Sequence, residues 1–204
     1  MYRDRIPSLV FFRSPFPGRL AERGFGAGPP WRSGLWWTRP RRPYDAAMGL
    51  LTPLAVRIGA ISSMPGLLPW ITRLDRGLHR VSGGHVGILD IAGLPNIMLT
   101  VSGRVSGEPR RTPLLCVRDG AHLLVAGSSF GAPRTPDWVH NLREAPTALV
   151  RKSGRSVEVE AEELTFHERD RAWSLMCLVW PNFALYERRT DRLIPVFRLT
   201  PVSA

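Results

Sequence analysis

A strict alternation of apolar and acidic residues in the C-terminal half constrains the fold more than any other feature of the sequence. Val157, Val159 and Ala161 alternate there with Glu158, Glu160 and Glu162. Successive side chains of a β-strand point to opposite faces, so this pattern predicts a strand over 156–164 with one buried face and one solvated face. Such one-sided strands are typical of antiparallel sheets.

Similar strand-like segments recur along the chain and are joined by tight turns, among them Asp119-Gly120 and Ser153-Gly154. Helices are expected where apolar residues recur at helical spacing, and Thr135 with Pro136 is suited to begin one of them. The other predicted strands cover 97–101, 111–118, 122–127, 147–152 and 195–199, and helices are predicted over 136–144 and 168–179, with a turn or helix over 181–192. Strands outnumber helices, so a mainly β (α+β) antiparallel barrel is favoured over an alternating parallel sheet.

Residues 1–48 differ in composition from the rest of the chain. They are rich in proline, glycine and arginine, and no helical or strand period survives in them. We expect a disordered extension, and we hypothesise that Met48 is the biological start, so that the extension is not native. Residues 49–204 are long enough for one domain, and two short helices are expected at its start, between 50 and 82.

The net charge of +11 does not by itself indicate a nucleic-acid partner. More than half of it comes from the extension, where nine arginines stand against Asp4, Glu22 and Asp45. A nucleic-acid-binding domain concentrates its basic residues on one face of the folded part. Of the 28 basic residues only Lys152 is a lysine, which indicates a coding bias toward arginine rather than selection for phosphate. No nucleic-acid partner is therefore expected.

No apolar run reaches the length of about 18 residues that a membrane-spanning helix needs. Cys116 and Cys177 form no CxxC motif, and the five histidines show no HxxxH or HExxH spacing, so neither a disulfide framework nor a metal site is expected. We expect a cytoplasmic protein. Two interpretations of the stretch 50–74 remain open. Its apolar stripe, with Arg57, Arg73 and Arg76 beside it, suits either packing on its own domain or peripheral attachment at the inner membrane face.

The segment 101–113, VSGRVSGEPRRTP, is the most informative one for function. It places glycines, hydroxyl groups and three arginines between two predicted strands. Glycines let backbone amides turn toward a ligand. One guanidinium group can donate two parallel hydrogen bonds to two oxygens of a phosphate or carboxylate. The segment suits an anionic cofactor, although a solvated hairpin loop has a similar composition. Neither a Walker loop nor a GxGxxG motif is present.

Three segments in succession resemble the motifs of the deazaflavin (coenzyme F420)-dependent nitroreductase and quinone reductase family. They are SGRVSGEPRRTPLLCVRDG, VAGSSFGAPRTPDWVHNLREAP and VWPNFALYERRTDRLIPVFRL, and RLDRGLHRVSGG before them is also similar to that family. The resemblance implies a six-stranded, FMN-binding-like split β-barrel with peripheral helices. It also implies that reduced coenzyme F420 delivers a hydride to a quinone, nitro compound or enone.

The resemblance further implies which residues form the site. The phosphate and polyglutamate tail of the cofactor would be held by Arg104, Val105, Ser106, Arg110, Arg111, Thr112 and Pro113. Beside the deazaflavin ring would pass Ala126, Gly127, Ser128 and Ser129, and the pocket would be completed by Asp137, Trp138, Val139, His140 and Asn141. The acceptor would lie against Leu115, Trp180, Phe183 and Tyr186, with Tyr186, Ser128 or solvent as the proton donor.

Two departures from the family pattern bear on the tail and the acceptor. Val105 and Ser129 stand where many members have a cation or asparagine, which removes some contacts to the tail. Trp180 and Phe183 stand where the best-known members have tyrosines. A pocket with these rings offers apolar contact but few hydroxyl groups, so we expect a quinone to be preferred over a nitro compound.

Two other functions remain open at this point. Similar barrels bind a lipid, tetrapyrrole or flavin cofactor without turnover, and others are FMN-dependent oxidases. The absorbance of a co-purified cofactor would discriminate between them. A small-molecule acceptor is the expected partner of a reductase, and the possibility of a homodimer is left open.

Overall fold

The computed structural model describes residues 57, 60, 93–152 and 154–202. The expected extension over residues 1–48 lies outside the described residues, as do nearly all of the two helices expected between 50 and 82.

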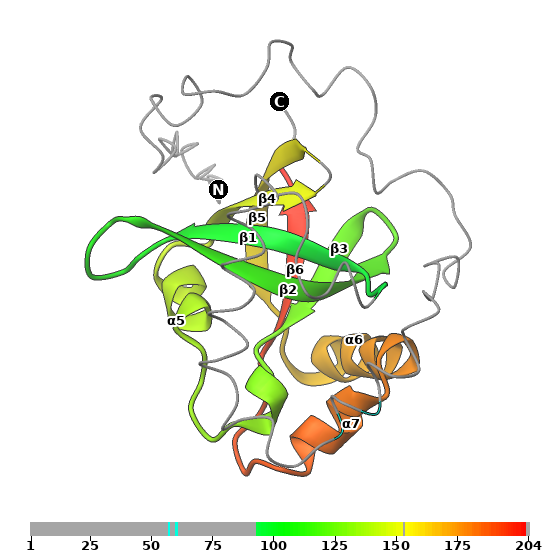
Figure 1. Cartoon of the computed structure of the whole chain (residues 1–204). Coiled ribbons are helices and arrows are strands. Elements are labelled where there is room, and N and C mark those ends of the chain that lie inside the picture. The colour runs from blue at the N-terminus through cyan, green and yellow to red at the C-terminus, as the bar shows by residue number, and fades with distance from the viewer. Residues whose placement is uncertain (1–56, 58–59, 61–92, 153, 203–204) are drawn as a thin grey trace, which may run out of the picture.

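Six antiparallel strands close into a barrel in the described part of the chain, in the order β1-β2-β3-β6-β5-β4 (Figure 1). The strands are β1 (Asn96–Ser102), β2 (Pro109–Asp119), β3 (His122–Ala126), β4 (Thr147–Lys152), β5 (Arg155–Glu163) and β6 (Val196–Pro201). Every neighbouring pair is antiparallel, including the closing pair of β1 and β4. The predicted antiparallel barrel is therefore confirmed, and each predicted strand lies within two residues of the observed ends.

The helices lie outside the barrel wall, in two groups. Between β3 and β4 come the short 3-10 helix η2 (Ser129–Gly131) and α5 (Asp137–Glu144), and between β5 and β6 come α6 (Phe166–Val179) and α7 (Asn182–Glu187). Figure 1 shows α5 on the side of the barrel from which the β1–β2 hairpin extends, whereas α6 and α7 lie together on the other side.

Three details of the predicted helices need correction. The N-cap of α5 is Pro136 rather than Thr135, and no side chain caps this helix. α6 begins two residues earlier than predicted, at Phe166, which has a φ of 46°. η2 was not predicted at all, because a three-residue turn leaves no periodic pattern in the sequence.

The barrel wall separates two apolar cores, because alternate residues of its strands point to opposite faces. In β3, Leu123 and Val125 point into the barrel, whereas Leu124 and Ala126 point outward beneath α6 and α7. The inner core also contains Trp138 of α5, whose ring lies 5.7 Å from that of Phe197. One core thus fills the barrel, and the other joins the barrel to α6 and α7.

Candidate functional site

The loop between β1 and β2 is fastened to α5 by one side chain. Asn141 of α5 accepts two hydrogen bonds at Oδ1, one from the backbone N–H of Arg104 and one from its guanidinium, each 3.2 Å long. Asn141 is only 4 % exposed, so these bonds are shielded from competing water. Within the loop, the Arg110 guanidinium donates to Ser106 Oγ at 3.3 Å. Two of the three predicted cofactor segments are thereby brought together.

Positive charge exceeds negative charge around this loop. Arg104 and Arg134 share one carboxylate, that of Asp137, at distances of 3.8 and 3.7 Å. Arg110 and Arg111 are exposed, and neither forms an ion pair with another described residue. Guanidinium groups in excess of their carboxylate partners suit a ligand with several anionic groups.

The segment that follows β3 is seated closely on α5 and on the start of β6. A Cβ added to Gly127 would lie 2.7 Å from Val139 Cγ2 and 2.9 Å from Pro195 Cγ, so no side chain fits at this position. The Gly127 N–H donates to the Pro195 carbonyl at 2.9 Å. The third predicted cofactor segment therefore lies directly against α5.

Beyond Gly127 the backbone follows an uncommon path. Ser129 and Phe130 have φ angles of 48° and 57°, a region that residues with side chains rarely occupy. Gly131, with a φ of 83°, passes so close to α7 that an added Cβ would lie 2.6 Å from the Tyr186 carbonyl oxygen. The rings of Phe130 and Tyr186 pack edge to face with centroids 5.5 Å apart. The two residues that directly follow the predicted ring-binding segment 126–129 are thus in contact with α7, the helix that carries the predicted acceptor residues Phe183 and Tyr186.

Arg192 holds this path from one side, and it is not among the residues that the sequence predicts. Its Nε donates to the Ala132 carbonyl and its Nη2 to the carbonyls of Gly127 and Ser128, each at 2.9 Å. Its Nη1 is buried and has no hydrogen-bond partner among the described residues, and burial lowers the pKa of the guanidinium. Arg192 lies within the third family-like segment, but an arginine before a strand carries no periodic signal, and nothing in the sequence distinguishes it from the neighbouring arginines Arg188 and Arg189.

The predicted acceptor residues lie in the outer core. Trp180, Phe183 and Tyr186 are at most 5 % exposed, and Leu115 packs against the same cluster. The Tyr186 hydroxyl accepts a hydrogen bond of 3.4 Å from Trp180 Nε1, and burial raises the pKa of this phenol. These rings therefore form a buried apolar layer beneath η2 and do not line the open pocket that the sequence predicts for an acceptor site.

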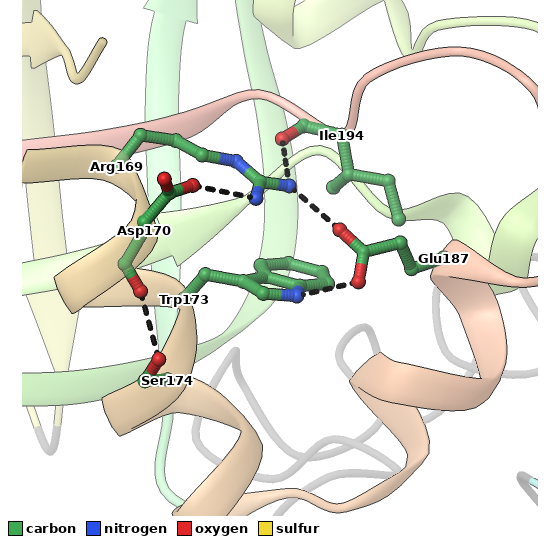
Figure 2. A network of polar contacts seen from close by, with 6 residues as sticks. All are labelled: Arg169, Asp170, Trp173, Ser174, Glu187 and Ile194. Carbon is green, nitrogen blue, oxygen red and sulfur yellow. Dashed lines mark hydrogen bonds and ion pairs between the residues drawn. The ribbon is translucent and has the colours of Figure 1, made fainter. Parts of the chain in front are cut away.

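A polar network fixes α7 on α6 (Figure 2). Arg169 is 7 % exposed, and its guanidinium donates to Glu187 at 3.0 Å and lies 4.7 Å from the Trp173 ring centroid. Trp173 Nε1 donates to the other oxygen of Glu187 at 2.9 Å, and the Trp173 ring lies 5.5 Å from that of Phe183. The orientation of α7 is thus set by Arg169, Trp173 and Glu187, none of which the sequence predicted as a site residue.

The remaining predicted residues differ in how they can contribute. The side chains of Trp138 and Val139 point into the inner core, so these two positions could contact a ligand only through their backbone. Ala126 points into the outer core. His140, Thr112 and Pro113 are half-buried, whereas Val105 is 91 % exposed.

A surface hollow of about 210 Å³ lies away from these segments, beside the N-terminal part of α6. Its charged residues pair with one another, for example Arg171 with Asp119 at 3.6 Å and Arg198 with Glu168 at 3.1 Å. The described residues contain no cluster of three or more His, Cys, Asp and Glu side chains that could hold a metal ion. No helix in the described part of the chain is long and apolar enough to span a membrane.

The sequence matches a family model over residues 70–201, a range that contains the barrel, the arginine-rich loop and the helices around it. The description of that family is F420H(2)-dependent quinone reductase. The chain belongs to this family.

One curated relative carries the same description as this family, and two solved structures are also similar to the chain. The F420H(2)-dependent quinone reductase Rv1261c of Mycobacterium tuberculosis is 32 % identical over 133 residues, which cover 64 % of this chain and 89 % of that protein. A solved F420-H2 dependent reductase (FDR-A) is 34 % identical over 52 % of this chain and 93 % of its own, with a TM-score of 0.48. A solved structure described as a domain-swapped dimer is 29 % identical over 63 % of this chain and 97 % of its own, with a TM-score of 0.50.

As a member of the F420H(2)-dependent quinone reductases, the chain is an oxidoreductase whose cofactor is reduced coenzyme F420. The donor set of the structure fits that cofactor. The arginines of the β1–β2 loop outnumber their carboxylate partners, as a tail with phosphate and glutamate groups requires. Gly127 leaves no side chain between the backbone and α5 at the segment predicted to pass the ring.

Proposed function

We propose that the β1–β2 loop, the segment 126–129 and α5 together hold reduced coenzyme F420, and that a quinone receives its hydride. Bound F420H2 supplies the hydride, and the residues of this chain supply binding and orientation. The observation that carries this proposal is the excess of guanidinium groups where Asn141 joins the loop to α5.

In this proposal Arg104, Ser106, Arg110 and Arg111 bind the anionic tail. Their contacts are equally strong before and during hydride transfer, so they lower the concentration of cofactor needed without changing the rate at saturation. Asp137 and Asn141 position Arg104 rather than binding the cofactor themselves. Positioning is the main contribution that a protein makes when its cofactor is intrinsically reactive.

The family membership supports a quinone as the acceptor; Trp180, Phe183 and Tyr186, which are at most 5 % exposed, would support its site from beneath with an apolar layer rather than line it. A flat apolar ring loses little by leaving water, whereas a nitro group would lose hydrogen bonds that these buried rings do not replace. Leu115 lies at the edge of the same cluster and would limit the size of the acceptor.

For the proton that completes quinone reduction, the geometry favours Ser128 over Tyr186. Ser128 is half-buried on the segment after β3, and its hydroxyl forms no hydrogen bond with another described residue. The Tyr186 hydroxyl belongs to the outer core and is only 2 % exposed, so it is less accessible to a bound acceptor than the half-buried Ser128 is.

The decisive experiment is anaerobic oxidation of reduced F420 by the purified full chain with menadione, followed by the return of oxidised-F420 absorbance. We expect turnover that saturates with both substrates and is not supported by reduced FMN. Tight binding of F420 without oxidation by any quinone would select the non-catalytic binding protein instead. Oxidation of reduced FMN in place of F420 would select the FMN-dependent oxidase.

Two further properties belong to this proposal. Attachment to the inner membrane face would bring the enzyme to lipid-soluble quinones, and flotation with anionic liposomes at low salt tests this attachment.

A homodimer is supported only by a relative that is described as a domain-swapped dimer. Sedimentation of the full chain at several concentrations tests it.

A further inference from the structure

The guanidinium of Arg192 is placed where it can set the direction of a whole backbone segment. It donates to three carbonyl oxygens, those of Gly127, Ser128 and Ala132, and among the described residues no carboxylate pairs with it. A half-buried charge that backbone dipoles alone compensate is costly, and in the described part of the chain the buried Nη1 of Arg192 has no hydrogen-bond partner. The fold retains this cost at the segment that joins the proposed cofactor site to α7.

The direction of the carbonyls fixes the direction of the amides. In a trans peptide the C=O of one residue and the N–H of the next point in opposite directions, and the described chain contains no cis peptide. Because the carbonyls of Gly127 and Ser128 point toward Arg192, the N–H groups of Ser128 and Ser129 point away from it. Neither N–H donates to another described residue.

The dihedral angles agree with this arrangement. Ser128 has right-handed helical angles, with φ −71° and ψ −41°, and Ser129 follows with a positive φ of 48°. This succession turns neighbouring N–H groups toward one concave side, where they bind anionic or carbonyl oxygens. Two successive non-glycine residues with positive φ, Ser129 and Phe130, are strained, and such strain is held by surrounding contacts at functional sites.

We propose that Arg192 is a positioning residue for the deazaflavin ring, because it holds the carbonyls of Gly127 and Ser128 and thereby presents the N–H groups of Ser128 and Ser129 to a carbonyl oxygen of that ring. This inference rests on the proposed function and adds a residue to it. Arg192 acts through the backbone, whereas the arginines of the β1–β2 loop act on the tail.

The experiment compares two ligands, oxidised F420 and the tail-less deazaflavin that lacks the phosphate and glutamates, by fluorescence titration of the full chain. Arg192→Gln should weaken the binding of both ligands by the same factor, about tenfold for the loss of ordered amide donors. Arg110→Ala should weaken the binding of F420 alone. Arg198→Gln is the matched control, since Arg198 pairs with Glu162 and Glu168 outside the site, and it should leave both affinities unchanged.

A second pair of variants tests the amide itself and does not depend on the folding of Arg192→Gln. Ser128 has a φ that proline adopts, so Ser128→Pro removes the N–H with little backbone change, and Ser128→Ala removes only the hydroxyl. We expect Ser128→Pro to bind the tail-less ligand about fivefold more weakly than Ser128→Ala does. Equal affinities of these two variants, or an Arg192→Gln protein that binds both ligands as the unmodified chain does, would overturn the inference. Failure of the unmodified chain to bind either ligand would instead overturn the proposed function.

Discussion

Asn141 Oδ1 accepts hydrogen bonds from both the backbone N–H and the guanidinium of Arg104, and the two residues are 37 positions apart in the chain. One buried amide therefore determines how the β1–β2 loop sits on α5. Asn141→Ala leaves the Arg104 N–H without this acceptor, and we expect it to lower the free energy of unfolding by about 1–3 kcal/mol. It should also weaken F420 binding, because the loop loses its attachment. Asn141→Asp keeps the acceptor oxygen and should retain most of the affinity in the same titrations.

Arg110→Ala should raise the KM for reduced F420 about tenfold, because a charge-assisted hydrogen bond contributes about 1.5–3 kcal/mol. The kcat should stay within about twofold, since contacts to the tail bind the ground state and the transition state equally. Steady-state kinetics with menadione measures both constants. Arg155→Ala, which removes an exposed guanidinium at the start of β5, is the control and should behave as the unmodified chain. A fall in kcat with unchanged KM would remove Arg110 from the tail site.

Phe183→Tyr tests the apolar layer beneath the acceptor site. Phe183 is 3 % exposed and lies between the rings of Trp173 and Tyr186, at 5.5 and 6.1 Å. A hydroxyl added there would be buried, and we expect a loss of about 1–3 kcal/mol of stability in urea unfolding rather than a gain of nitroreductase activity. Appearance of nitroimidazole reduction without loss of stability would mean that this ring faces an open pocket.

A matched pair of substitutions tests which of the two candidate residues, Ser128 or Tyr186, donates the proton. Tyr186→Phe removes a hydroxyl that is buried in the outer core, so kcat should change by less than about twofold. Ser128→Ala should lower kcat by about tenfold or more if the serine assists protonation of the quinone. Stopped-flow oxidation of F420H2 measures both variants. The reverse order of effects would assign the role to Tyr186.

Cys116 gives a prediction for alkaline pH. Burial raises the pKa of its thiol from 9.0 to about 11. Between these values the native state keeps the proton that the unfolded state has lost, so this thiol lowers the free energy of unfolding as pH rises from 9 to 11, by up to about 1.4 kcal/mol per pH unit. Urea unfolding of the chain and of Cys116→Val over this range should show a shallower decline in the variant. Identical slopes would contradict the prediction.

The sequence predicted the strands well because residues such as Val157 and Val159 alternate with glutamates, and alternation is a direct consequence of strand geometry. The resemblance to the family pointed to segments that the structure brings together around α5, and their binding of the cofactor stays a prediction. It could not predict Arg192, Asn141 as an anchor for Arg104, or the path through Ser129 and Phe130, because these depend on contacts between residues distant in the chain. The burial of Phe183 and Tyr186 was missed for a different reason. α7 has only six residues, too few for a periodic apolar pattern to show which of its faces is buried. The hydrogen bond between Arg169 and Glu187 determines which face of α7 lies against α6.

A single layer of strands separates the two apolar cores, and this restricts where residues can be inserted or deleted. In β3, one inserted or deleted residue would exchange Leu123 and Val125 with Leu124 and Ala126, which moves every side chain to the wrong compartment. Length variation in this wall is therefore confined to the turns, whereas α6 and α7 touch the outer compartment alone. Under the proposed function, substitutions on α7 would therefore alter the layer beneath the acceptor site without changing a side chain inside the barrel.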